Sequence, residues 1–115
     1  MIIVVAALEF TDQKARDSAI EITSEVQLRT RNQESGCRDY CFAADPAVAT
    51  RIQVYELWED SESLAQHFQH PYYDEMAELL QGIGIVSSTN RAYLIEKEES
   101  VYTEKGEKKR VFFDG

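Results

Sequence analysis

The chain has 115 residues, of which 43% are hydrophobic and 29% charged, and its formal net charge is −9. This length suits one domain with one hydrophobic core. The negative charge disfavours binding to nucleic acid or to an anionic membrane surface, and no apolar run approaches the roughly 20 residues that span a bilayer.

Residues 1–10 (MIIVVAALEF) are apolar and largely β-branched, which predicts a first strand. The segment has no basic region or small-residue cleavage site, so we do not interpret it as a signal peptide. Both of its faces are apolar, and such a strand belongs to a sheet that is covered on two sides. One face carries Ile3, Val5 and Ala7, and the other carries Ile2, Val4 and Leu8.

Residues 11–33 have a helical period, with Thr11 or Asp12 as the predicted N-cap. The expected apolar stripe consists of Ala15, Ala19, Ile22 and Val26. Residues 37–44 and 50–59 are predicted strands joined by the turn signal Asp45-Pro46, so they form a hairpin.

Cys37 and Cys41 lie four residues apart on one predicted strand, about 13 to 14 Å from each other. A disulfide tolerates a Cα separation of at most about 7 Å, so these two cysteines cannot pair within the strand. Free thiols are typical of a reducing compartment, and we expect a cytoplasmic location.

Residues 61–82 are predicted to form two helical pieces, with Ser61 capping the first piece and Pro71 starting the second. Residues 85–96 are a predicted last strand whose polar first half is a candidate for a loop or bulge. Residues 97–115 are a charged tail ending in VFFDG. This tail is either mobile or docks on another surface, such as a partner subunit.

The predicted order β-α-β-β-α-β is that of a ferredoxin-like α+β fold, a four-stranded antiparallel sheet with its helices on one face. We assign residues 1–96 to this domain. Its strands are apolar on both faces, yet the helices cover only one. A second copy of the sheet would cover the other face, so we expect a homodimer.

The candidate site lies between residues 40 and 73, where seven of the twelve aromatic residues fall. Such a cluster is either a packed core or the lining of a pocket for a flat organic molecule. His67 is the strongest candidate for a general base. We expect no metal site, because Pro71 disturbs the helix beside His67 and His70. The chain also has no glycine-rich phosphate loop and no catalytic cysteine signature.

Two segments, ESGCRDY at 34–40 and YELWEDSESLAQHFQHPYY at 55–73, resemble the antibiotic biosynthesis monooxygenase family of the dimeric α/β-barrel superfamily. The resemblance covers about residues 1–96. The positions that match the family pattern are Glu34, Gly36, Cys37, Tyr40, Glu56, Trp58, His67 and Pro71.

The resemblance implies a ferredoxin-like protomer, a homodimeric α/β barrel and a pocket between sheet and helices. It further implies a monooxygenase that oxidises a small phenolic or quinol molecule with O₂ and uses no flavin, metal or other cofactor. On this basis we expect His67, Trp58 and Tyr72 to be catalytic. The expected substrate-binding residues are Tyr40, Glu56, Phe68 and Tyr73. The alternative is a non-catalytic dimeric module that binds a hydrophobic small molecule or serves in a stress response.

Two departures from the family pattern stand out. Tyr72 occupies a position where many relatives carry a histidine, which removes one expected acid–base group. The haem-degrading branch needs an asparagine in the first strand, a tryptophan in the second helical region and a haem-ligating histidine. The sequence has Ala7 or Leu8, His67 and Ala77 at those places, which argues against haem degradation.

Overall fold

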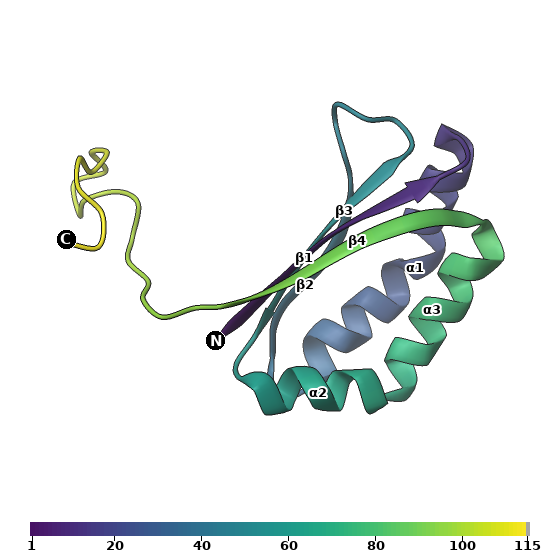
Figure 1. Cartoon of the computed structure of the whole chain (residues 1–115), viewed down its shortest axis with the longest axis horizontal. Helices are drawn as coiled ribbons and strands as arrows, with labels where there is room; N and C mark the ends of the chain where they lie inside the picture. The colour runs from purple at the N-terminus through teal and green to yellow at the C-terminus, as the bar shows by residue number, and fades with distance from the viewer. Residues whose placement is uncertain (115) are drawn as a thin grey trace.

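The computed structural model describes residues 1–114 and contains four strands and three helices (Figure 1). In chain order these are β1 (Ile2–Phe10), α1 (Gln13–Gln33), β2 (Cys37–Ala44), β3 (Arg51–Trp58), α2 (Ser61–Gln69), α3 (Pro71–Ile83) and β4 (Ile85–Leu94).

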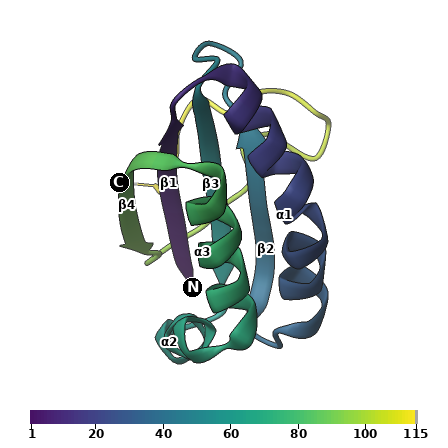
Figure 2. The same ribbon diagram turned by 90° about the vertical axis from the view of Figure 1, so that its right-hand side faces the viewer.

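The strands form one antiparallel sheet in the order β2-β3-β1-β4, with β1 and β3 in the middle. All three helices lie on the same face of this sheet (Figure 2). The predicted ferredoxin-like α+β fold is therefore confirmed. The sheet itself is open, since its edge strands β2 and β4 do not pair with each other.

Helix α1 packs on the sheet through a stripe that differs from the predicted one. Asp12 is the N-cap, and its carboxylate accepts a hydrogen bond of 2.8 Å from the Ala15 amide. Ala19 and Val26 are buried as expected, but Ile22 is 47% exposed and the adjacent Thr23 is buried instead. The Thr23 hydroxyl is satisfied locally because it donates to the Ala19 carbonyl at 2.7 Å.

The helical stretch after β3 is divided at His70, as the proline predicts. The cap of α2 is Asp60 rather than the predicted Ser61, and its carboxylate accepts from the Ser63 amide at 2.8 Å. His70 then caps α3, with its Nδ1 accepting from the Tyr72 amide at 3.1 Å. Pro71 fits the first turn of α3 because no donor is needed there.

The loop from α1 to β2 lies directly against the start of α2. A Cβ atom at Gly36 would come within 2.0 Å of the Ser63 hydroxyl, so only glycine fits this approach. The Gly36 carbonyl accepts a hydrogen bond of 2.8 Å from the Glu59 amide. These contacts hold the segment that carries Glu34 against the start of α2. The site described below is built from these two parts of the chain.

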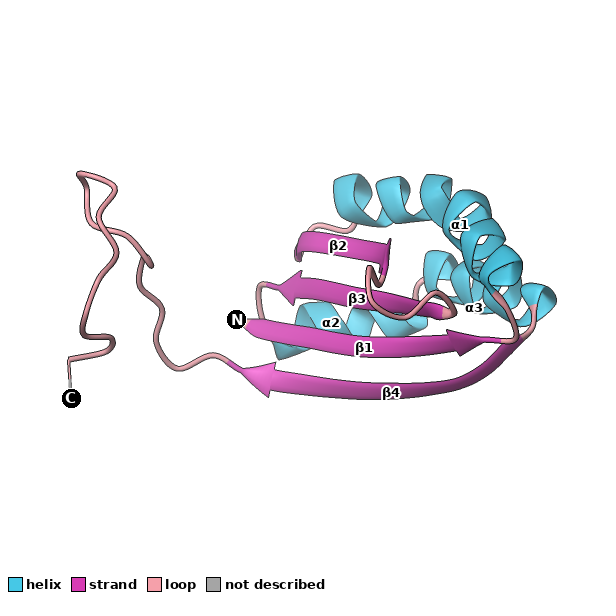
Figure 3. Ribbon diagram, turned by 90° about the horizontal axis from the view of Figure 1, so that it is seen from above, coloured by secondary structure: helices cyan, strands magenta, loops and turns pink. Residues whose placement is uncertain are grey.

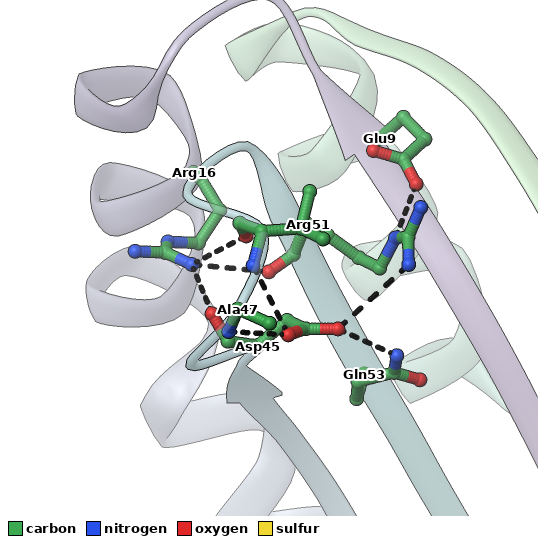
Figure 4. A network of polar contacts seen from close by, with 7 residues as sticks. Glu9, Arg16, Asp45, Ala47, Arg51 and Gln53 are labelled. Atoms are coloured by element: carbon green, nitrogen blue, oxygen red, sulfur yellow. Dashed lines mark hydrogen bonds and ion pairs between the residues drawn. The ribbon is translucent and has the colours of Figure 1, made fainter.

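A polar network secures the opposite end of the domain, at the β2–β3 turn (Figure 4). Arg16 on α1 donates to the Arg51 carbonyl at 3.1 Å, and the Arg51 guanidinium pairs with Glu9 on β1. Asp45 accepts from the Ala47 amide and from the Gln53 side chain, both at 2.8 Å. The turn is thereby tied to α1, β1 and β3 together.

Strand β4 is an edge strand, and every residue in it after Ile85 is exposed. The polar first half that suggested a loop or bulge is part of the strand. The pairing register with β1 shifts between Glu9 and Phe10, so the irregularity is a bulge at the beginning of β4.

The sheet face away from the helices has no cover from residues 1–114, as the view from above indicates (Figure 3). Ile3 and Val5 on β1 face Leu57 and Tyr55 on β3, and Ile3 also faces Tyr93 on β4. Val5, Tyr55 and Tyr93 are between 37% and 54% exposed. The predicted apolar character of both strand faces is thus present, and this second face is exposed within the single chain.

Beyond β4 the chain leaves the domain and extends away from it (Figures 1 and 3). This arm contains a small turn closed by a bridge between Tyr102 and Lys108. Its apolar residues Val111, Phe112 and Phe113 are exposed. Among the described residues, no helix combines the length and the apolar character needed to cross a membrane.

Candidate functional site

A cavity of about 460 Å³ lies between the helix-side face of the sheet and helices α2 and α3. We call it the aromatic cavity. Its volume is in the range of small-molecule sites. Its lining residues are Val4, Ala6, Leu8, Tyr40, Phe42, Val54, Glu56, His67, Phe68, Tyr73, Met76, Ala77, Leu80, Gln81, Ile85, Ser88 and Asn90.

Most of the residues that were predicted from the sequence to form the site line this cavity. Tyr40 comes from β2, Glu56 from β3, His67 and Phe68 from α2, and Tyr73 from α3. Glu56 and Tyr40 reach it because alternate strand residues share a face, and theirs is the face toward the helices. The lining is apolar apart from a few polar groups, which is typical of a site for a flat organic ligand.

His67 is held among aromatic rings at the wall of the cavity. Its ring centre lies 4.6 Å from that of Trp58, 5.5 Å from that of Tyr40 and 5.6 Å from that of Tyr73. Burial disfavours the imidazolium form and lowers the pKa of His67 to about 4. The imidazole is therefore neutral at physiological pH, so one ring nitrogen carries a proton and the other carries a lone pair.

Glu34 holds one of these two nitrogens. Its carboxyl oxygens lie 3.0 and 3.1 Å from His67 Nδ1, and the Glu34 and His67 side chains are only 6% and 2% exposed. Burial, followed by repulsion from Glu56, raises the pKa of Glu34 to about 7. Nδ1 is thereby occupied, and Nε2 is the nitrogen left for a molecule in the cavity.

Glu34 was not among the site residues expected from the sequence, although it belongs to the segment that carries the family resemblance. The available signal was its position directly after a helix and before Gly36. Its partner His67 is 33 residues away, on an element that follows two intervening strands. Only the fold brings the two side chains together.

Glu56 is a second buried carboxyl at the cavity. Its Oε1 accepts a hydrogen bond of 2.9 Å from Trp58 Nε1. Burial raises the pKa of Glu56 to about 7, while the bond from Trp58 acts in the opposite direction. Near neutral pH this group can therefore hold or release a proton.

Trp58 and Tyr72 were expected to be catalytic, but neither lines the aromatic cavity. Trp58 is fully buried behind His67 and supports that ring and Glu56. Tyr72 lies on the α1 side of α3, where Arg29 sits 5.0 Å over its ring and Gln33 accepts from its hydroxyl. Consecutive helix residues point about 100° apart, so Tyr73 faces the cavity and Tyr72 does not.

A second, smaller cavity of about 180 Å³ lies on the other side of the Glu34–His67 pair. We call it the polar cleft. It is lined by Gln33, Glu34, Ser35, Gly36, Trp58, Ser63, Gln66 and His70. Gln33, Ser35 and Gln66 are exposed, so the cleft opens to solvent. His67 thus borders the aromatic cavity and Glu34 borders the polar cleft.

The two cysteines are free thiols, as predicted. Burial, followed by repulsion from Glu34, raises the pKa of Cys37 to about 12, so its thiol is protonated and a poor nucleophile. Within residues 1–114, no group of three or more His, Cys, Asp or Glu side chains is arranged to hold a metal ion. His67 and His70 have separate hydrogen-bond partners in Glu34 and the Tyr72 amide.

Comparison with solved structures shows the same fold in several proteins. A proposed antibiotic biosynthesis monooxygenase from Deinococcus radiodurans superposes with a TM-score of 0.79 at 17% identity, over 90% of this chain and all of that one. Another antibiotic biosynthesis monooxygenase gives 0.71 at 21% identity, over 84% of this chain and all of that one. Protein Rv0793 from Mycobacterium tuberculosis gives 0.70 at 18% identity, over 87% of this chain and all of that one.

Comparison of sequences gives a relative and a family. An uncharacterised protein from Synechocystis sp. is 31% identical over 55 residues. That segment is 48% of this chain but only 37% of the relative, so this chain matches well under half of the relative's length. The family model described as antibiotic biosynthesis monooxygenase matches residues 1–79, which span β1 to most of α3. The chain therefore belongs to the antibiotic biosynthesis monooxygenase family.

Proposed function

We propose that this protein is a cofactor-independent monooxygenase that oxidises a small phenolic or quinol molecule with O₂ in the aromatic cavity. The observation that carries the proposal is the buried His67 at the cavity wall, whose Nδ1 lies 3.0 Å from a Glu34 carboxyl oxygen, which leaves Nε2 to act as a base. Family membership and the apolar, aromatic lining support the same chemistry.

The first step is loss of the phenolic proton. His67 Nε2 accepts it, and the resulting phenolate is electron-rich enough to donate an electron to O₂. The buried apolar walls contributed by Phe42 and Met76 limit the access of water to the reduced oxygen. Conversion of a phenol to a quinone consumes one O₂, places one oxygen atom on the ring and releases the other as water.

Tyr40, Phe68 and Tyr73 are proposed to hold the substrate ring. Phe68 and Tyr73 already form an edge-to-face pair with ring centres 4.8 Å apart. Burial raises the pKa of the Tyr40 phenol well above its usual range, so this group stays a hydrogen-bond donor. Glu56 is the second proton acceptor within the cavity.

We further propose that the protein works as a homodimer in which the open sheet face of one chain covers that of another. The exposed apolar residues Val5, Tyr55 and Tyr93 on this face support the proposal, and so does the usual dimeric state of the family. The arm after β4 carries Phe112 and Phe113 away from its own domain. We propose that it docks on the partner subunit.

The test of the activity is O₂ uptake with a panel of phenols and quinols. We expect uptake by the wild-type protein, about a 100-fold loss in His67→Ala because the base is removed, and little change in the control Tyr72→Phe. With ¹⁸O₂, one labelled atom should enter the product.

Equal uptake by the wild type and His67→Ala would refute the proposal. Binding of the panel without any uptake would instead support a non-catalytic binding module. Formation of hydrogen peroxide without labelled product would identify an oxidase.

A further inference from the structure

Glu34 and His67 lie between two cavities of opposite character. His67 faces the apolar aromatic cavity, and Glu34 faces the polar cleft, which opens to solvent. Glu34 Oε1 and His67 Nδ1 are 3.0 Å apart and both side chains are buried, so a proton can pass between them without entering bulk water. No other titratable side chain of the described residues lies in this contact.

We infer that Glu34 is the proton carrier behind His67, and that the pair forms a relay joining the aromatic cavity to the polar cleft. Glu34 acts through His67, so it is a positioning and proton-storing residue that does not touch the substrate. The inference builds on the proposed function, but its central test needs no substrate.

The relay step balances as a double proton transfer. The substrate O–H bond breaks as a bond from its hydrogen to His67 Nε2 forms. At the same time the Nδ1–H bond breaks and the proton joins a Glu34 oxygen. The imidazole remains neutral, and the negative charge moves from Glu34 to the substrate. When reduced oxygen later takes the proton from Nε2, the Glu34 proton returns to Nδ1.

The protonation state of Glu34 sets the tautomer of His67. An ionised carboxylate only accepts, so Nδ1 must carry the proton and Nε2 is a free base. A protonated carboxyl can donate to Nδ1, which moves the imidazole proton to Nε2 and removes the base. The raised pKa of Glu34 puts this exchange near neutral pH, so the base becomes available as pH rises through about 7.

The groups around Glu34 and His67 determine which side chains at the site titrate near neutral pH. Burial, followed by repulsion from Glu56 on β3, raises the pKa of Glu34, and burial, followed by repulsion from His70 at the end of α2, lowers the pKa of His67. Burial raises the pKa values of Cys37 and Tyr40 on β2, so both stay protonated. The remaining group facing Tyr40 is Tyr73 on α3.

The polar cleft gives the stored proton an outlet. Glu34 lines it together with exposed Gln33 and Ser35, so the buried carboxyl borders a cleft that opens to solvent. If Glu34 served only to pack against His67, an apolar contact would suffice, and burial of a carboxyl would only cost stability.

The test is ¹⁵N NMR of the histidine rings in the ligand-free protein, from about pH 5.5 to about pH 8.5. Protonated and bare ring nitrogens resonate far apart, and a His70→Asn variant assigns the His67 signals. We expect the His67 proton to move from Nε2 to Nδ1 with a midpoint near the pKa of Glu34, about 7. In Glu34→Gln, which keeps a hydrogen-bonding side chain but cannot titrate, the tautomer should not change with pH.

A tautomer that is constant across this range in the wild type would overturn the inference, and so would an exchange that persists in Glu34→Gln. Where the protein oxidises a phenol, Glu34→Gln should also lose the rise in rate near pH 7 and about 100-fold in rate. An observed exchange without any O₂ uptake would leave the relay standing and refute only the proposed oxidation.

Discussion

Three titratable side chains beside the aromatic cavity are shifted toward their neutral forms. Burial raises the pKa values of Glu34 and Glu56 to about 7 and lowers that of His67 to about 4. Between about pH 4.5 and about pH 6.5, ordinary carboxyl and imidazole groups carry a charge, whereas Glu34, Glu56 and His67 are largely neutral. The site therefore combines a neutral base with two carboxyls that can exchange protons near neutral pH, a pattern typical of functional sites.

This pattern predicts how stability depends on pH at Glu56. The folded protein holds a proton on Glu56 up to about pH 7, while the unfolded chain releases it near the usual value of 4.5. The folded state thus binds more protons between these values, and Glu56 lowers the free energy of unfolding as pH rises through this window. His67 acts in the opposite direction, because its pKa is lowered.

Replacing Glu56 with glutamine removes its titration but keeps an acceptor for Trp58 Nε1. Relative to the wild type, we expect Glu56→Gln to gain free energy of unfolding between about pH 5 and about pH 8, on the order of 1 to 3 kcal/mol. His67 is present in both proteins, so its contribution cancels in the difference. Urea unfolding at each pH measures the difference in free energy of unfolding between the variant and the wild type. A difference that is the same at both pH values would contradict the raised pKa of Glu56.

At the scale of elements, hydrophobic period and turn signals were sufficient to predict the strands and helices and their order. They were not sufficient to predict which of two neighbouring residues points inward. Ile22 was expected in the core of α1 but Thr23 is buried there, and of the two neighbouring tyrosines expected at the site, Tyr73 lines the cavity and Tyr72 does not. Each difference is one step of about 100° around a helix, which tertiary packing decides.

Long-range side-chain pairs were beyond prediction for a different reason. His67 and Glu56 were predicted to be site residues from their chemistry and from the family resemblance, and both line the cavity. The hydrogen bond from Glu34 to His67 depends on how the α1–β2 loop passes the start of α2. The close contact of Gly36 with Ser63 sets that path, and the sequence contains no local sign of it.

At the level of the whole molecule, the open sheet face has exposed apolar residues that the described residues of a single chain do not cover. Sedimentation of the wild-type protein should give twice the chain mass of 13.2 kDa. A Val5→Glu, Tyr55→Glu variant should sediment as a monomer, because charges on both central strands would meet across the interface. Ser24→Glu on the exposed side of α1 is the matched control and should remain dimeric.

Deleting residues 97–115 should weaken the dimer if the arm docks on the partner, and the same sedimentation experiment measures it. A monomeric wild type would contradict the proposed dimer. A deletion that leaves the dissociation constant unchanged would contradict only the role of the arm.

The proposed oxidation requires that the aromatic cavity bind a phenol and remove its proton. It is tested most directly by adding a naphthol, whose neutral and anionic forms absorb at different wavelengths, under nitrogen at about pH 8, below the pKa of a free phenol of about 10. We predict the anion spectrum for naphthol bound to the wild type and the neutral spectrum for naphthol bound to His67→Ala. Naphthol that binds the wild type in its neutral form, or that does not bind at all, would refute deprotonation of a phenol in this cavity.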